Sequence, residues 1–230
     1  MFCANLIKNG DAPNTADFYL SRYFQQSIFF IPSHIMEAKL VLEFSTRNEL
    51  RDWLAGNHDS HRGAWVVCNR SGKSDREGLP YLDIVYEALC FGWIDSSVKT
   101  HENRTLQRIT PRKSGSNWTE LNKERCRHLE RSGLMTDAGR AVLPDNMDNG
   151  EPCMDENILA LLQSDKVFAE NFAKLPALYK RVRIGNMHLK HCKEPKIYRR
   201  RLEKFIDCTR RGVMYGEWND GGRLLQDLQK

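Results

Sequence analysis

The chain has 230 residues and the composition of an ordinary globular protein, with 40% hydrophobic residues, 28% charged residues and a formal net charge of +5 at pH 7. Its apolar runs, such as Ile28 to Ile31, are far shorter than the roughly 20 residues that cross a bilayer. The first residues also lack the basic cluster, apolar stretch and cleavage site of a secretory signal. These features argue against a membrane-spanning or secreted protein and predict a cytoplasmic one.

The cysteines agree with a cytoplasmic location. They are seven in number, widely scattered and never in a C-x-x-C arrangement: Cys3, Cys68, Cys90, Cys126, Cys153, Cys192 and Cys208. An odd number without paired spacing is typical of free thiols.

The charge is distributed unevenly. The segment from Pro176 to Arg211 contains 12 basic and three acidic residues, a net charge of +9, which leaves −4 for the rest of the chain. The protein therefore has one strongly basic segment and a mildly acidic remainder, and this segment is the natural candidate for contact with an acidic partner.

Residues 1–35 form a leader without sustained periodicity. We expect this leader to be disordered or foreign to the native protein, with Met36 as the native start. A helix around Asp17 to Gln26 is the alternative.

The first clear element is a strand from Lys39 to Phe44, where apolar residues alternate. Ser45 or Thr46 then caps a helix, because Glu49 follows Thr46 at the spacing of a capping box. This helix ends near Gly56-Asn57. A second strand is predicted from Gly63 to Cys68, followed by a polar loop over residues 69–78.

The stretch ALCFGWIDSSVKT, residues 88–100, indicates a corner between a helix and a strand. Pro80 opens the helix, and Gly92 stands where the end of a helix favours a residue that tolerates positive φ. A strand follows from Trp93 to Val98, and a turn at His101 to Arg104 leads into a strand from Leu106 to Thr110 that closes a hairpin.

A helix is predicted from Trp118 to Arg131, capped by Ser116 or Asn117 and ended by Gly133. A short helix from Thr136 to Val142 follows, and the pattern is helical again from Asn157 to Gly212. The segment after Arg211, which contains Trp218, is rich in turn-forming residues and either folds back over the sheet or lies against a second subunit.

The order of these elements predicts an α+β fold, with a twisted antiparallel sheet flanked by helices and a basic helical appendage. We expect the α+β core over residues 36–144, a linker over 145–156, the basic helical domain over 157–225 and a tail over 226–230.

Several blocks of the sequence resemble the YdeI/OmpD-associated family, also called bacteriocin-protection proteins. They are Asn57-His58, ALCFGWIDS, the segment from Ile109 to Arg140 that begins ITPRKSGSNWTELN, and the later blocks FAKLP and KEPKIYRRRL. The resemblance extends over about residues 44–225 and implies a fold like that of the YjbR/CyaY-like proteins. It also implies a link to tolerance of bacteriocins or cationic antimicrobial peptides, without an established ligand or reaction.

One candidate ligand site combines aromatic walls with polar groups, as ligand sites commonly do. It is a shallow pocket with Trp93 and Trp118 as walls and Arg112 and Lys113 as anion-binding groups, with Asp95, Asn122 and His58 nearby. The helix start at Trp118 adds backbone N–H groups that favour an anion. The alternative is that both tryptophans are core residues and that Asp95 forms a structural ion pair with Arg112.

The second candidate surface is the exposed face of the last basic helix, with Arg199, Arg200 and Lys204 as phosphate-binding residues. The opposite face carries a core stripe at helical spacing: Tyr198, Leu202, Phe205, Ile206 and Thr209.

We expect neither a metal nor another cofactor. His58 with His61, and His188 with His191, form couples without the further ligands of a tetrahedral zinc site. Cys90 lies among apolar residues, where a thiol stays protonated and unreactive.

The leading hypothesis is therefore a non-enzymatic cytoplasmic binding or stress-tolerance protein, with an unidentified small ligand or protein partner. A phosphate-ligand or nucleic-acid binder that uses the basic helices is the alternative. An enzyme with His58, Asp95 and Arg112 in its site is the third and weakest hypothesis. The sequence does not determine the oligomeric state.

Overall fold

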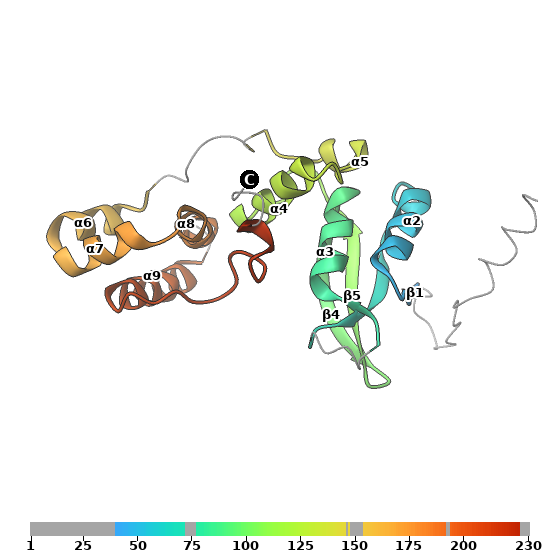
Figure 1. Ribbon diagram of the computed structural model, residues 1–230, viewed down its shortest axis with the longest axis horizontal. Coiled ribbons are helices and arrows are strands. Elements are labelled where there is room, and N and C mark those ends of the chain that lie inside the picture. The colour runs from blue at the N-terminus through green and yellow to red at the C-terminus, as the bar shows by residue number, and fades with distance from the viewer. Residues whose placement is uncertain (1–39, 72–76, 146, 148–153, 192–193, 226–230) are drawn as a thin grey trace, which may run out of the picture.

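The structure, a computed structural model, describes residues 40–71, 77–145, 147, 154–191 and 194–225. It has an αβ lobe (residues 40–147) and a helical lobe (residues 154–211), with a C-terminal tail (residues 212–225) that returns between them (Figure 1). The predicted α+β fold class is confirmed. The predicted leader, residues 226–230 and most of the predicted linker lie outside the described residues.

The αβ lobe contains a five-stranded sheet of order β1-β2-β5-β4, with β3 also paired to β2. The strands are β1 (Val41–Leu42), β2 (Ala64–Asn69), β3 (Leu79–Pro80), β4 (Trp93–His101) and β5 (Arg104–Pro111). The β4–β5 hairpin is antiparallel, as predicted, and β5 is antiparallel to β2. The sheet as a whole is mixed, because β1 and β3 are parallel to β2. A helix between β1 and β2 returns the chain to the edge where it started, which makes those two strands parallel.

The helices of the αβ lobe are α2 (Arg47–Asn57), α3 (Tyr81–Cys90), α4 (Glu120–Arg131) and α5 (Asp137–Arg140), and those of the helical lobe are α6 (Glu156–Ser164), α7 (Lys166–Lys174), α8 (Ala177–His191) and α9 (Pro195–Arg210). Among the described helices, none has both the length and the apolar character needed to cross a membrane.

The capping prediction for α2 is confirmed, and that for α4 is wrong by a few residues. Thr46 Oγ1 accepts a hydrogen bond from the Glu49 amide at 3.3 Å. For α4 the cap is Thr119, whose Oγ1 accepts from the Asn122 amide at 3.1 Å. The predicted caps, Ser116 and Asn117, are instead bonded to Arg112 within the preceding loop.

The main core lies between the sheet and the helices α2 and α3. Strand β2 is buried on both faces, with Val66 in this core and Trp65 in a smaller cluster on the opposite face. Glu87 is a buried acid on α3, and it is neutralised by Arg47 at 2.5 Å and by Arg51 at 2.9 Å, both on α2. These ion pairs fix α2 against α3.

The corner between α3 and β4 packs closely against α5. Gly92 has φ of 73°, in the left-handed region that glycine tolerates, and a Cβ there would lie 2.8 Å from the Ala138 carbonyl oxygen. A Cβ on Gly139 would lie 2.2 Å from the Cys90 carbonyl oxygen. Thr136 Oγ1 donates to that same oxygen at 2.6 Å, so the corner determines where α5 lies.

The helical lobe has its own aromatic core, to which Phe168, Tyr179 and Phe205 contribute. Helix α8 belongs to both cores, because Leu178 and Val182 pack in the core of the αβ lobe. The two lobes are therefore in direct apolar contact.

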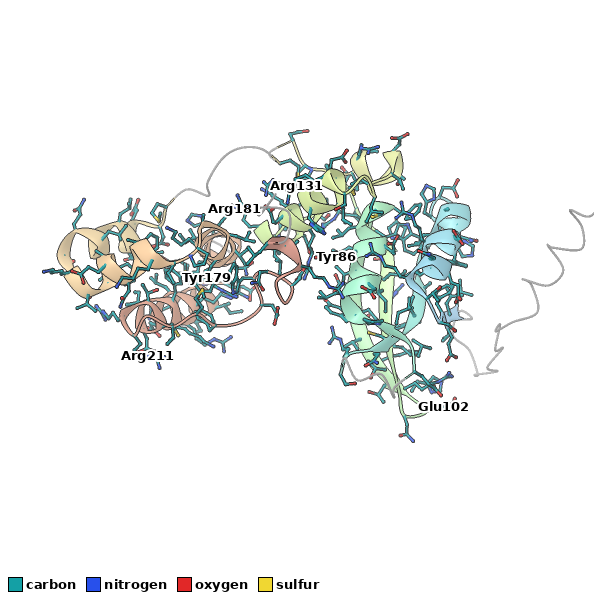
Figure 2. All side chains as sticks on the ribbon, viewed as in Figure 1. Tyr86, Glu102, Arg131, Tyr179, Arg181 and Arg211 are labelled. Carbon is teal, nitrogen blue, oxygen red and sulfur yellow. The ribbon has the colours of Figure 1, made fainter. Side chains whose placement is uncertain are left out.

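The tail joins the lobes a second time. Trp218 packs edge-on against Tyr179, with ring centroids 5.7 Å apart, and Leu224 is fully buried in the core of the αβ lobe. Figure 2 shows Tyr179 and Tyr86 on either side of the tail. Asp220 of the tail, which is 2% exposed, accepts two hydrogen bonds from Arg125 of α4, each at 2.7 Å.

Candidate anion-binding site

A pocket of about 710 Å³ lies between the loop that follows β5 and the segment that follows α5. Residues of this loop form one side of the pocket: Arg112, Lys113, Ser114, Gly115, Ser116 and Trp118. The segment 141–145, which we call the strap, forms the other side with Ala141, Val142, Leu143, Pro144 and Asp145. The pocket thus has a cationic side and a largely apolar one.

The central group is the guanidinium of Arg112. It lies over the Trp118 ring at 3.6 Å from the ring centroid, a stacked geometry in which cation and indole attract. Its Nη1 donates to Ser116 Oγ and to the Asn117 carbonyl oxygen, both at 3.2 Å. These contacts orient the guanidinium before any ligand arrives.

The Arg112 guanidinium has no close carboxylate partner among the described residues. Among them, Arg112 forms no ion pair within 4.0 Å, and its buried Nε has no hydrogen-bond partner. Burial lowers the pKa of Arg112 from its ordinary value, while Cys126 and Asp95 act in the opposite direction. Because arginine remains protonated at neutral pH, the site keeps a partly desolvated cation, which an anion would stabilise.

The short helix α5 places the strap opposite this cation. Thr136, the predicted first residue of this short helix, is its N-cap and accepts from the Gly139 amide at 3.3 Å. The close contact of Gly139 with Cys90 holds the helix on the α3–β4 corner. The strap follows directly.

The structure brings together Arg112, Lys113 and Trp118 at the pocket, whereas the other predicted residues do not line it. Trp93 is 1% exposed in the main core, and its Nε1 donates to the His58 carbonyl oxygen at 3.0 Å. Trp93 is therefore a core residue, as the alternative interpretation stated. Trp118, in contrast, is half-buried at the pocket.

The three remaining predicted side chains have structural partners. His58 Nδ1 lies 3.0 Å from the Leu54 carbonyl oxygen, within hydrogen-bonding distance. Asp95 accepts a hydrogen bond from the Tyr81 hydroxyl at 2.7 Å, and burial, together with Asp95, raises the pKa of Tyr81 to about 12. The expected ion pair between Asp95 and Arg112 is not among those of the described residues. Asn122 Oδ1 accepts from Arg125 Nη1 at 2.7 Å, and so supports the arginine that holds the tail.

Metal and thiol chemistry receive no support from the described part of the chain. Within it, no three or more His, Cys, Asp or Glu residues are placed to hold a metal ion. Cys90 is fully buried, and burial raises the pKa of its thiol to about 11.

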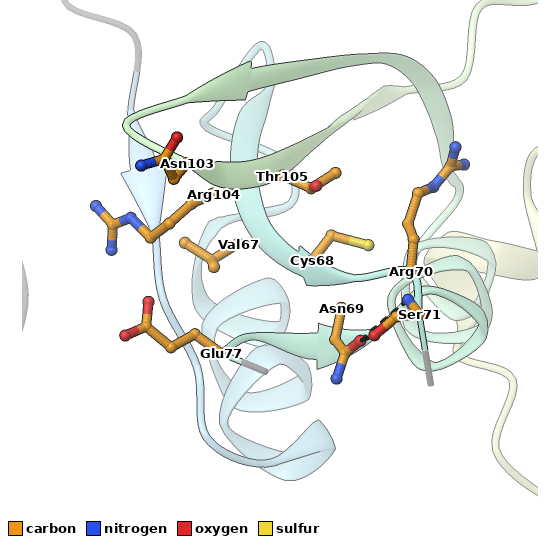
Figure 3. Close-up of a pocket in the computed structure, with 9 residues that line it drawn as sticks. All are labelled: Val67, Cys68, Asn69, Arg70, Ser71, Glu77, Asn103, Arg104 and Thr105. Atoms are coloured by element: carbon orange, nitrogen blue, oxygen red, sulfur yellow. Dashed lines mark hydrogen bonds between the residues drawn. The ribbon is translucent and has the colours of Figure 1, made fainter. Parts of the chain in front are cut away.

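A second pocket, of about 400 Å³, lies where β2 and the β4–β5 turn meet (Figure 3). Several of its polar groups have partners: Asn69 Oδ1 accepts from Ser71 Oγ at 2.9 Å, and Arg104 pairs with Glu43, outside the pocket lining, at 3.0 Å. Arg70 stacks on Tyr81 at 4.4 Å from the ring centroid. This pocket is therefore a weaker candidate for an anion-binding site than the pocket at Arg112.

The predicted basic surface lies on α9. Arg199 and Arg200 are exposed, and neither forms an ion pair with another described residue. Lys204 is also exposed, with its ammonium 4.6 Å from the centroid of the Tyr215 ring. Arg210 and Arg211, later on the same helix, pair with Asp165 and Asp207.

Sequence reasoning missed the strap and the hydroxyls of Ser114 and Ser116. The loop residues were within reach of a sequence argument, because they flank the predicted arginine. Leu143 and its neighbours were not, because their approach to Arg112 depends on how α5 packs against Cys90.

The family described as Domain of unknown function (DUF8412) matches residues 42–142, which lie within the αβ lobe and include Arg112 and Trp118. No curated protein and no solved structure matches the chain.

Proposed function

We propose that the protein binds a small anionic ligand at Arg112, as a binding protein rather than an enzyme. The observation that carries this proposal is the half-buried Arg112 guanidinium, stacked on Trp118 and without a carboxylate partner among the described residues. Donors that the fold already holds in place favour anion binding, because little conformational entropy is lost in ordering them when the anion binds.

The chemistry around the pocket supports binding more than catalysis. Lys113, Ser114 and Ser116 supply further donors to an anion. The neighbouring thiol, Cys126, is not an activated nucleophile, because burial raises its pKa to about 12.

The resemblance to the bacteriocin-protection family enters here as part of the proposal. A cationic pocket repels a cationic peptide, so we propose that any contribution to peptide tolerance is indirect and follows from binding an anion in the cytoplasm.

The test compares Arg112→Gln with Arg108→Gln, which removes an exposed arginine from β5, the strand that precedes Arg112. Binding of inorganic phosphate and acetate is followed by calorimetry and by tryptophan fluorescence, with Trp118→Phe to assign the signal. Loss of a charge-assisted hydrogen bond should weaken binding by about 10- to 100-fold in Arg112→Gln, with little change in Arg108→Gln. Equal affinity in the two variants, or no binding to the wild-type protein, would overturn the proposal.

A second candidate function, binding of nucleic-acid phosphates by α9, rests on the exposed Arg199 and Arg200, which have no ion pair among the described residues. Replacing both by alanine should weaken oligonucleotide binding and reduce its salt dependence by about one unit of log–log slope for each phosphate that is no longer neutralised. Replacing Arg210 and Arg211 is the matched control, because their charges are already paired. Unchanged salt dependence in the Arg199/Arg200 variant would reject this surface.

A further inference from the structure

We infer that the anion bound at Arg112 carries an unbranched apolar chain, so that the ligand class is an amphipathic carboxylate. This inference rests on the proposed function and adds a second subsite to it. The subsite is a neighbouring depression of about 440 Å³.

The second depression is apolar although three arginines surround it. It is lined by Cys126, Arg127, Glu130, Arg131, Arg140, Leu143 and Met147. The charged ends of the arginines are paired with carboxylates, one of them Glu130 of the same lining. Arg127 and Arg131 pair with Glu124 at 3.0 and 3.3 Å, and Arg140 pairs with Glu130 at 3.0 Å.

With their guanidinium groups held by carboxylates, these arginines present their methylene stems to the depression. The Arg127 guanidinium also donates to the Met147 carbonyl oxygen, which fixes the chain just beyond the strap. Leu143, Met147 and the stems thus make a surface suited to methylene groups rather than to a second anion.

The two depressions are neighbours. Leu143 lines both. Cys126 lines the apolar depression and lies on α4, the helix that follows the loop of Arg112. A ligand whose head group binds Arg112 therefore has an apolar surface in the neighbouring depression, which shares Leu143 with the cationic pocket.

This arrangement selects among anions. Inorganic phosphate or acetate would use only the cationic subsite, and a polyanion would place further charge against an apolar surface at a desolvation cost. A single carboxylate with a saturated chain satisfies both subsites, since each buried methylene adds favourable transfer free energy.

The experiment measures the affinity of the full chain for linear carboxylates from acetate to decanoate by calorimetry, below their micelle concentrations. Affinity should rise about fourfold for each added methylene until the apolar depression is filled. Arg112→Gln should weaken every member of the series by a similar factor.

Met147→Gln keeps the length of the side chain but adds a polar amide, and should reduce the gain for the longer chains while leaving acetate unchanged. Val98→Gln is the matched control, because Val98 is 48% exposed on β4 and lines neither depression. Circular dichroism and the melting temperature verify that each variant is folded.

The possible outcomes separate the two proposals. Binding of acetate with no dependence on chain length would overturn the amphipathic ligand and leave the anion site in place. No binding of any carboxylate or of phosphate would overturn both. A gain with chain length that is the same in Met147→Gln as in Val98→Gln, or that is shown equally by linear alcohols, would assign the gain to non-specific adsorption and would also overturn the inference.

Discussion

Replacing Asp220 by asparagine tests whether the tail holds the two lobes together. The wild-type carboxylate accepts hydrogen bonds from Arg125 Nε and Nη2 at 2.7 Å each and from the Tyr86 hydroxyl at 3.0 Å. Asparagine keeps the size of the side chain and one acceptor oxygen, but it removes the charge and places an amide group beside a guanidinium.

The magnitude follows from burial. The side chains of Arg125 and Asp220 are 8% and 1% exposed, so the substitution leaves a buried cation without its counter-ion. Removing one partner of a buried pair typically costs about 3–5 kcal/mol. Because Asn122 still accepts one hydrogen bond from Arg125, we expect a loss of about 3 kcal/mol, near the lower end of that range.

The assay is urea unfolding followed by tryptophan fluorescence, with Asp207→Asn as control. Asp207 pairs with Arg211 at 2.6 Å, but these side chains are 64% and 61% exposed, and an exposed pair contributes at most about 1 kcal/mol. Limited proteolysis should also cleave the tail of Asp220→Asn faster than that of the wild-type protein. If both variants lose the same stability and the tail stays equally protected, the reasoning is refuted.

Two further predictions concern packing and pH. Gly139→Ala should destabilise by about 1–3 kcal/mol, because the new methyl group meets the Cys90 carbonyl oxygen, whereas Gly56→Ala, with nothing within 4 Å, should stabilise α2 by about 0.5–1 kcal/mol; thermal melts that rank the two variants in the opposite order would contradict the packing argument. Burial raises the pKa of the Cys68 and Cys90 thiols to about 11 and that of Cys126 to about 12, from an ordinary value of 9.0. Unfolding therefore releases protons above pH 9.0, and the stability contributed by the protonated thiols, fully present below that pH, should be lost progressively as the pH rises toward 12. Urea titrations on either side of the thiol pKa measure this effect, and a free energy of unfolding that stays constant or increases would exclude it.

The sequence predicted the features that depend on a few neighbouring residues. The N-cap at Thr46, the positive φ of Gly92 and the hairpin turn at His101 to Arg104 all follow from local backbone requirements, and the structure confirms each. The α+β class follows from the order of such elements.

Features that depend on distant contacts were not accessible in the same way. Trp93 and Trp118 are both aromatic residues with polar neighbours in the sequence, yet Trp93 is fully in the core and Trp118 lines the pocket. The pairing of Asp220 with Arg125 joins residues on opposite sides of the helical lobe in the sequence. In the candidate site, the sequence could predict the residues of the loop around Arg112, but it could not predict that the apolar strap lies opposite them.

The contacts of the tail also set an order of events during synthesis. The helices and strands of the αβ lobe are complete at Arg140, yet Leu224 belongs to its core and Asp220 neutralises its buried Arg125. The ribosome must therefore translate all four helices of the helical lobe before the αβ lobe acquires its last core residue. We expect the nascent αβ lobe to expose Arg125 and the cavity of Leu224 during that interval, so that its final consolidation occurs late and together with the docking of the helical lobe.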